Sequence, residues 1–225
     1  MKCELLLLDY DGTLCDTKPA ITHSITKTFG HFGRESPSEA RITELITHGV
    51  PITEAFHMLS KDLDYTPDRA QWIAAYRDIY HEEGDRFTRL YATVEETLAY
   101  LAQRRIPLVV LSNKGVAAIH RSLKQFGLSP YMDMVVGDGT VTDRKMELKP
   151  HRMIFDEIIR PRFPSVDPEH ILMTGDTKAD IDFGNNCGIR TCWASYGYGH
   201  PVDTRHAAPH FTISSFGELR DLLTV

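Results

Sequence analysis

The feature of this sequence that most constrains its fold is a short apolar run that ends abruptly at acidic residues. Residues 5–8 are all leucine, and the sequence Asp-Tyr-Asp-Gly-Thr follows directly. A short apolar run bounded by turn-forming residues is typical of a strand that is buried on both faces, as strands are in a parallel sheet. We therefore expect residues 5–8 to form a strand of such a sheet.

Similar apolar segments recur along the second half of the chain and alternate with helical patterns. The expected further strands are residues 107–112, 132–136, 170–174, 190–194 and a short segment at 211–213. The expected helices are residues 94–105, 116–126, 150–160, 177–187 and 216–223. This alternation predicts an α/β fold with a doubly wound, Rossmann-like parallel sheet and right-handed crossovers.

One segment interrupts the alternation. Between the first strand and Val94 the pattern contains no strand, and it predicts helices over residues 21–32, 38–47, 52–63 and 67–83. We infer an all-helical domain inserted after the first strand, with residues 1–16 and 90–225 forming the core domain and residues 17–89 the insert. Trp72, Tyr76 and Tyr80 recur there at helical spacing, which favours a core face over a row of substrate contacts.

Composition and charge exclude several classes of protein. The chain has 225 residues, 42% of them hydrophobic, and a net charge of -6, so neither a disordered chain nor a nucleic-acid binder with a basic face is expected. It contains no apolar run near the roughly 20 residues of a membrane-spanning helix, and its first residues lack signal-peptide features. The four cysteines have no zinc or CxxC spacing, which indicates reduced thiols. These features predict a cytoplasmic protein without a membrane partner.

Polar and charged residues gather where the predicted strands end. Asp9 and Asp11 follow the first strand, Ser112 and Asn113 the second, and Asp176 the fourth. Lys149 precedes the helix predicted from Pro150, and Asp180 lies one turn beyond Asp176. In open α/β sheets, ligands bind beyond the carboxyl ends of the strands where the strand order reverses, so these residues form one candidate site.

The chemistry of this set suits a phosphoryl group and a hard cation. Asp9, Asp11 and Asp176 would repel one another unless a cation lay among them, and all-oxygen ligands suit Mg²⁺. Lys149 and Ser112 would supply a positive charge and a hydrogen-bond donor to a phosphoryl group. Aspartate carboxylates can also accept phosphoryl groups.

Each motif also has a structural interpretation when taken alone. The Asp-Tyr-Asp-Gly sequence could be an ordinary acidic turn, and Asp176 could be the N-cap of a helix with Asp180 in solvent. The occurrence of all the motifs in order, each at the end of a strand or helix, favours the functional interpretation.

These motifs together resemble the haloacid dehalogenase-like hydrolase superfamily. The resemblance is carried by Asp9-Tyr10-Asp11-Gly12-Thr13-Leu14, Ser112-Asn113-Lys114, Lys149-Pro150 and residues 175–181. It extends from residue 5 to about residue 198, and the helical insert is similar to the α-helical cap of that superfamily. Residues 48–51 and 196–199 are most similar to the phosphoglycolate phosphatase-like group.

The resemblance implies a role for each site residue. Asp9 would be the nucleophile and a Mg²⁺ ligand, and Asp11 would be the general acid and base and bind the metal through its backbone carbonyl. Asp176 would be a further metal ligand, and Asp180 would orient the waters of the metal or Lys149 without binding the metal itself. The resemblance also implies that Ser112, Asn113 and Lys149 bind the phosphoryl group.

The implied activity is Mg²⁺-dependent hydrolysis of a small phosphorylated metabolite, with phosphoglycolate as the first candidate. The alternatives are a pyrophosphatase, a sugar phosphomutase or a phosphonate hydrolase on the same fold, or a catalytically silent regulatory module. A phosphonate hydrolase of this type would need a lysine in the insert, and Lys18, Lys27 and Lys61 are the candidates. The sequence is compatible with either a monomer or a homodimer.

Overall fold

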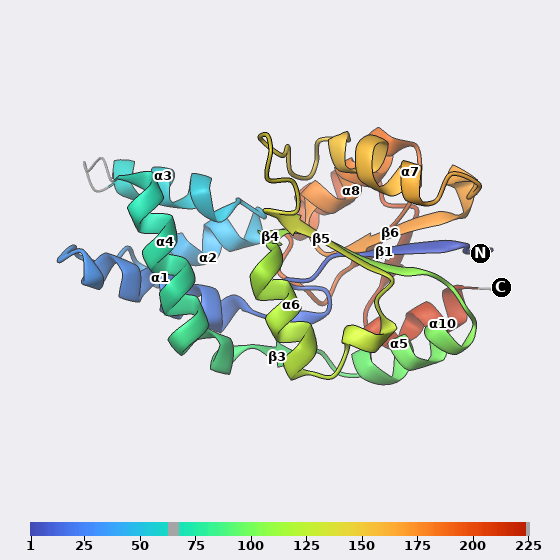
Figure 1. The fold of residues 1–225 in the computed structure, drawn as a ribbon, viewed down its shortest axis with the longest axis horizontal. Helices are drawn as coiled ribbons and strands as arrows, with labels where there is room; N and C mark the ends of the chain where they lie inside the picture. Colours follow the sequence, from blue (N-terminus) through green and yellow to red (C-terminus); the bar gives the residue numbers. More distant parts are fainter. Residues whose placement is uncertain (63–67, 224–225) are drawn as a thin grey trace.

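The protein is built around a six-stranded parallel sheet that lies between two layers of helices (Figure 1). The computed structural model describes residues 1–62 and 68–223. The sheet order is β5-β4-β1-β6-β7-β8. Its strands are β1 (Leu5–Leu8), β4 (Leu108–Gly115), β5 (Met134–Asp138), β6 (Ile171–Gly175), β7 (Arg190–Ala194) and β8 (Phe211–Ile213). The predicted doubly wound α/β fold is confirmed.

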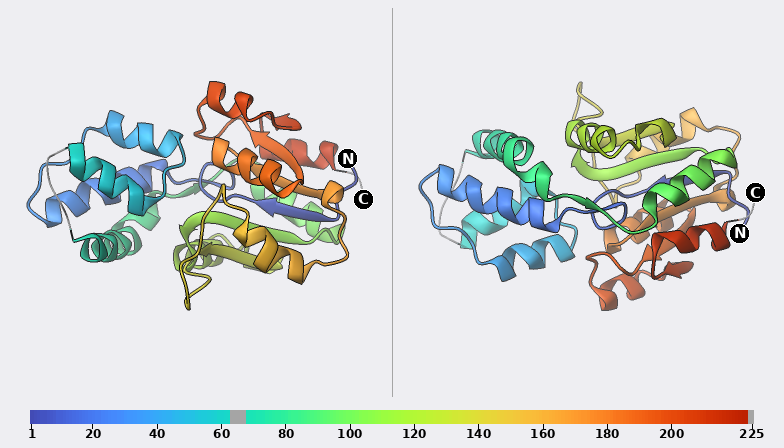
Figure 2. Two further views of the ribbon diagram at one scale, coloured as in Figure 1. Left: turned by 90° about the horizontal axis from the view of Figure 1, so that it is seen from above. Right: turned by 90° about the horizontal axis from the view of Figure 1, so that it is seen from below.

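The four leucines of β1 are divided between the two faces of the sheet. Leu6 and Leu8 belong to one hydrophobic cluster, whereas Leu5 and Leu7 belong to another, because successive side chains of a strand point to opposite faces. The first cluster includes side chains of α5 (Val94–Gln103), α6 (Val116–Gln125) and α10 (Leu219–Leu222), and the second includes side chains of α8 (Lys178–Cys187). Figure 2 shows these helices on opposite sides of the sheet. All four leucines are fully buried.

Two elements of the sheet layer differ from the sequence prediction. The second predicted strand continues past Ser112 to Gly115, with an irregular register after Leu111, so Ser112 and Asn113 lie within its last part. The helix predicted over residues 150–160 instead contains a π-helical turn, Phe155–Ile159, and ends in the short α7 (Arg160–Arg162). Pro161 follows directly after the predicted helix but lies within α7. The wider π turn before it relieves the clash that a proline ring makes in a regular α-helix.

A separate group of helices extends from the carboxyl end of the sheet (Figure 1). It consists of α1 (Lys18–His31), α2 (Glu39–Thr47), α3 (Ile52–Asp62) and α4 (Arg69–Ile79), followed by a π-helical turn, Tyr80–Gly84. The predicted helix ends at residues 63 and 67 lie outside the described residues. The side chains of Ser38 and Asp68 accept hydrogen bonds from the first backbone N–H groups of α2 and α4.

A two-stranded antiparallel ribbon that the sequence did not predict joins these helices to the sheet layer. It is formed by β2 (Cys15–Asp16) and β3 (Arg89–Leu90). Two residues are too few to show an alternating apolar pattern, so the pairing has no local sequence signal.

The remaining short elements complete the chain. They are α9 (Pro201–His206) and the 3₁₀ turns Asp85–Phe87, Ser129–Tyr131, Pro168–His170 and Phe216–Glu218. Among the residues described, no helix combines the length and the apolar character needed to cross a bilayer. The four cysteines are buried and free.

The helical insert has its own aromatic core. Phe56 lies 5.6 Å from the rings of both Trp72 and Tyr76 and 6.0 Å from Phe29, measured between ring centroids. Edge-on aromatic contacts of this kind add to the free energy gained from burying apolar area. Trp72 therefore belongs to the core face, as its spacing predicts.

We expect Phe56→Ala to lower the free energy of unfolding by about 3–5 kcal/mol, since it leaves a cavity among these rings. Phe56→Leu fills most of that space and should lower the free energy of unfolding by clearly less. Urea denaturation followed by circular dichroism measures both values. Equal losses for the two variants would contradict a tightly packed aromatic core.

Candidate active site

The carboxyl ends of three adjacent strands bring the predicted site residues together. The central strand β1 ends at Leu8 and leads into Asp9, its neighbour β4 carries Ser112, and its other neighbour β6 leads into Asp176. Asp9, Ser112 and Asp176 are all buried. Because parallel strands end at one edge, residues more than 160 positions apart in the sequence meet there.

Lys149 forms the centre of this cluster. Its Nζ lies 2.8 Å from Asp9 Oδ1, 2.5 Å from Asp180 Oδ1 and 2.8 Å from the carbonyl oxygen of Leu111. The Lys149 side chain is only 2% exposed. Asn113 holds the Lys149 backbone, because its Nδ2 donates to the Lys149 carbonyl at 3.0 Å and its Oδ1 accepts from the Lys149 N–H at 2.9 Å. Asn113 thus positions the lysine.

Three of the aspartates have the geometry to hold a metal ion. Carboxylate oxygens of Asp9, Asp176 and Asp180 lie within 4.8 Å of one another, and all three residues are buried. Asp176 Oδ1 is buried without a hydrogen-bond partner, which is costly unless a cation satisfies it. A set of buried oxygen ligands with an orphaned carboxylate oxygen fits a hard divalent cation such as Mg²⁺. The Asp11 side chain lies outside this triad.

The electrostatics of the site follow from its burial. Burial raises the pKa of Asp9, and the nearby charge of Asp180 raises it further, while Lys149 lowers it. Burial also raises the pKa of Asp176, together with the charges of Asp180 and Asp9. Burial opposes the charge of Lys149, but the carboxylates of Asp180 and Asp9 outweigh it and raise the pKa of the ammonium group. A divalent cation among the carboxylates would favour their ionised form.

Asp180 has a second structural task at the start of α8. Its Oδ2 accepts a hydrogen bond from the backbone N–H of Thr177 at 2.9 Å, as in a capping box, and a further one from the Thr177 hydroxyl at 2.8 Å. A Cβ on Gly175 would come within 2.2 Å of the Asp180 carboxyl carbon. The aspartate is therefore fixed by its own helix terminus as well as by Lys149.

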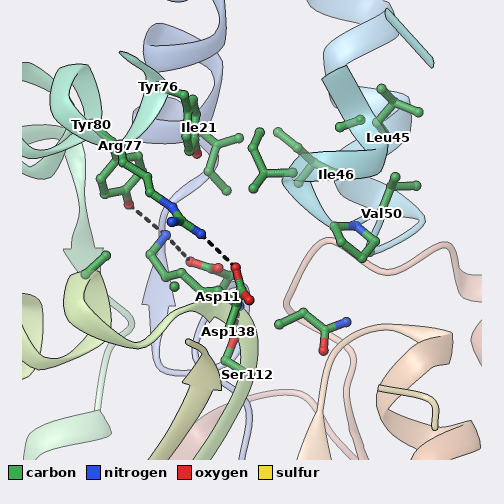
Figure 3. A pocket seen from close by; sticks show the side chains of 18 of the residues that line it. Asp11, Ile21, Leu45, Ile46, Val50, Tyr76, Arg77, Tyr80, Ser112 and Asp138 are labelled. Carbon is green, nitrogen blue, oxygen red and sulfur yellow. Dashed lines mark hydrogen bonds and ion pairs between the residues drawn. The ribbon is translucent and has the colours of Figure 1, made fainter. Parts of the chain in front are cut away.

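Asp11 lies on the side of the site that faces the helical insert. Its Oδ1 is 3.1 Å from Lys114 Nζ, and the same Nζ lies 3.0 Å from the hydroxyl of Tyr80 (Figure 3). The Lys114 ammonium also lies 4.2 Å from the centroid of the Tyr80 ring. Lys114 belongs to the Ser112-Asn113-Lys114 motif, but the sequence alone assigns it no role. Its position directly after Asn113 was the only available signal.

The loop after β7 supports Asp176, a contact that its likeness to the phosphoglycolate phosphatase-like group did not predict. The Tyr198 N–H donates to Asp176 Oδ2 at 2.6 Å, while its hydroxyl lies 2.9 Å from the backbone nitrogen of Lys18 and 2.8 Å from Asp16 Oδ1. A Cβ on Gly197 would lie 2.3 Å from the Asp176 Cβ. The loop thus links Asp176 to the start of the insert, and its glycine allows the close approach.

A cavity of about 450 Å³ opens between this edge of the sheet and the helical insert. Asp9, Asp11, Ser112, Asn113, Lys149 and Asp180 line one end, and Tyr76 and Tyr80 of the insert line the other. Tyr76 and Tyr80 therefore belong to the core and also border the cavity. Arg77 of α4 forms an ion pair with Asp138 of β5 at 2.8 Å, which links the helical insert to the sheet (Figure 3).

Comparison with known proteins places the chain in a class of enzymes. Residues 6–194 match the family model of haloacid dehalogenase-like hydrolases. The chain belongs to this family, which confirms the resemblance drawn from its motifs, and it is therefore a hydrolase.

Individual relatives extend the likeness over almost the whole chain. A phosphoglycolate phosphatase of Aquifex aeolicus is 30% identical over 219 residues, covering 97% of this chain and 96% of that protein. One of Vibrio vulnificus (strain YJ016) is 28% identical over 227 residues, covering 99% and 96%. A Haemophilus somnus crystal structure, described as a predicted phosphoglycolate phosphatase, has a TM-score of 0.85 at 24% identity and covers 99% of this chain and 98% of its own. A haloacid dehalogenase-like hydrolase from Streptococcus pneumoniae has a TM-score of 0.81 at 23% identity, with 98% of each chain covered.

We expect Lys149→Met to destabilise the metal-free protein by about 3–5 kcal/mol, because two buried carboxylates lose their counter-charge. Saturating Mg²⁺ should recover part of this loss, since a cation replaces the missing positive charge. Urea denaturation with and without Mg²⁺ measures both effects. Lys145→Met is the matched control, because that side chain is 82% exposed and should change little. A Lys149→Met variant as stable as the control would contradict the central role of the lysine.

Proposed function

We propose that this hydrolase is a Mg²⁺-dependent phosphatase that cleaves small phosphorylated metabolites through a phosphoryl intermediate on Asp9. The observation that carries this proposal is the placement of Asp9. Its carboxylate lies at the carboxyl end of the central strand, hydrogen-bonded to a buried ammonium group and facing the cavity. A carboxylate held in this way is an oriented nucleophile for a phosphorus atom.

In the first step, the free carboxylate oxygen of Asp9 attacks phosphorus and the ester P–O bond breaks. The electron pair of that bond goes to the leaving oxygen, which takes a proton from the Asp11 carboxyl group. Lys149 and Ser112 offer a positive charge and a hydroxyl donor to the phosphoryl oxygens at the same edge of the sheet. Lys114 holds Asp11 on the cavity side, where the leaving group would lie.

In the second step, water attacks the phosphorus of the aspartyl-phosphate and the bond to Asp9 oxygen breaks. Asp11, now a carboxylate, accepts the proton of the attacking water. Inorganic phosphate is released and Asp9 regains its carboxylate. The Asp11 carboxyl group gives up a proton in the first step and takes one back in the second, so the same side chain serves as acid and then as base.

Asp9 and Asp176, with the Asp11 backbone carbonyl, would hold the Mg²⁺, and Asp180 would orient Lys149 beside them. When bound, the cation neutralises the charge that gathers on the phosphoryl group and the carboxylates. We further propose that residues 17–89 act as a cap that covers the cavity and excludes bulk water during the first step.

The names of the relatives support phosphoglycolate as one of the substrates. A phosphonate hydrolase is less well supported, because the lysines among the described residues that line the cavity are Lys114 and Lys149, and both lie outside the helical insert. The chain also retains every acidic and basic residue that the phosphatase mechanism uses, which weighs against a silent regulatory module.

Asp9→Asn should lower phosphate release from phosphoglycolate and from ethyl phosphate by roughly a thousandfold or more, because an amide is a poor nucleophile. The measurement is inorganic phosphate release with Mg²⁺ present and after its removal with EDTA. Asp221→Asn makes the same chemical change at an exposed position on α10 and should leave the rate unchanged. If Asp9→Asn kept the activity of the parent protein, the assignment of Asp9 as the nucleophile would be refuted.

Asp11→Asn should affect substrates according to their leaving groups. Ethyl phosphate needs a proton on its alkoxide, so its turnover should fall by about 10²–10⁴-fold. Nitrophenolate leaves without a proton, so p-nitrophenyl phosphate should still phosphorylate Asp9 but the intermediate should then persist. Rapid mixing should show a burst of nitrophenolate equal to the enzyme concentration. Equal slowing of both substrates without a burst would contradict the acid–base role.

A further inference from the structure

The cavity that contains the acidic cluster continues into an apolar surface of the helical insert. Side chains from α1, α2 and the turn after α2 form this surface, which we call the aliphatic wall (Figure 3). Its members are Ile21, Ile25, Ile42, Leu45, Ile46 and Val50. They line the same cavity as Asp11 and Ser112 and also belong to or pack against the core of the insert. A group esterified to a phosphoryl unit at Asp9 would therefore extend towards them.

The basic side chains around this cavity are already paired with carboxylates. Arg77 lies 2.8 Å from Asp138, and Arg121 lies 3.4 Å from Asp85. His81 lies 3.5 Å from the same Asp85. The two lysines of the cavity are paired with site aspartates, as described above. Among the described lining residues, each basic group thus has an acidic partner, so a carboxylate on the substrate would meet cations whose charge a protein carboxylate already offsets.

We propose that the preferred substrate carries an uncharged, mainly apolar alkyl or aryl group, which packs against the aliphatic wall. This inference rests on the proposed phosphatase function and specifies its substrate class. A carboxylate placed against aliphatic side chains loses its hydration without gaining a counter-ion, whereas an apolar group gains from the same burial. The organic group of phosphoglycolate is a single methylene that carries a carboxylate. Phosphoglycolate is then a weaker substrate than an apolar ester.

The expected discrimination follows from the transfer of apolar area out of water. Each buried methylene group contributes about a fourfold gain in kcat/KM, if its burial is complete in the transition state. Ethyl phosphate offers two apolar carbons to the aliphatic wall, and 3-methylbutyl phosphate adds three more. We expect kcat/KM for 3-methylbutyl phosphate to exceed that for ethyl phosphate and for phosphoglycolate by roughly tenfold or more.

The test compares these three phosphomonoesters on the full-length protein with saturating Mg²⁺, by inorganic phosphate release. Ile46→Arg should reverse the order, because an unpaired guanidinium in the wall attracts the carboxylate of phosphoglycolate and excludes the alkyl group. Ile46→Ala is the milder variant, which should lower the ratio of 3-methylbutyl to ethyl phosphate without adding a charge. Ala40→Arg adds the same charge at an exposed position of α2 away from the cavity and should leave the ratios unchanged. Circular dichroism melts verify that each variant is folded.

The outcomes separate this inference from the proposed function. Hydrolysis of all three esters with equal kcat/KM, or a preference for phosphoglycolate, would overturn the apolar substrate class and leave the phosphatase intact. Ratios that do not change in folded Ile46→Ala and Ile46→Arg would overturn the role of the wall. Failure to release phosphate from any ester, including p-nitrophenyl phosphate, would overturn the phosphatase function and the inference with it.

Discussion

The contact of the Lys149 ammonium with Asp9 and Asp180 is the interaction on which the rest of the site depends. Three buried carboxylates within 4.8 Å of one another would repel strongly in a medium of low dielectric constant. The ammonium offsets part of this repulsion, and Asn113 fixes its backbone through two hydrogen bonds. The remaining negative charge, centred on the unpartnered oxygen of Asp176, would attract a divalent cation.

Most of this arrangement could be predicted from the sequence, because the end of each strand can be recognised locally and a parallel sheet places those ends side by side. Each apolar run marks where a strand ends, and the topology then brings all carboxyl ends to one edge. Asp9, Ser112 and Asp176 could therefore be grouped without knowledge of any contact. The strand limits were less accurate, since β4 continues to Gly115 through an irregular register that depends on its pairing with β5.

The contacts between the helical insert and the sheet layer could not be predicted in the same way. Lys114 contacts both Asp11 and Tyr80, which are 103 and 34 positions away from it in the sequence. Nothing in the local sequence pattern indicates that these residues are close in space. The link from Tyr198 to Asp16 spans 182 positions and depends on where the short ribbon of β2 and β3 places the insert. Such contacts follow from how the helices dock, which helical periodicity alone leaves undetermined.

The two ends of the cavity differ in chemistry because they arise from different parts of the chain. The sheet edge holds three buried carboxylates and one buried ammonium group, so a divalent cation there would offset the excess negative charge beside a phosphoryl group. The insert contributes mainly aliphatic and aromatic side chains. Contacts with these side chains are favourable because they remove apolar surface from water, and not because of charge. Under the proposed function, the reaction type would depend on Asp9 and its neighbours, whereas the choice of substrate would depend on the wall that contains Ile46. A substitution in that wall would then change the organic group that is accepted and leave the geometry around phosphorus the same.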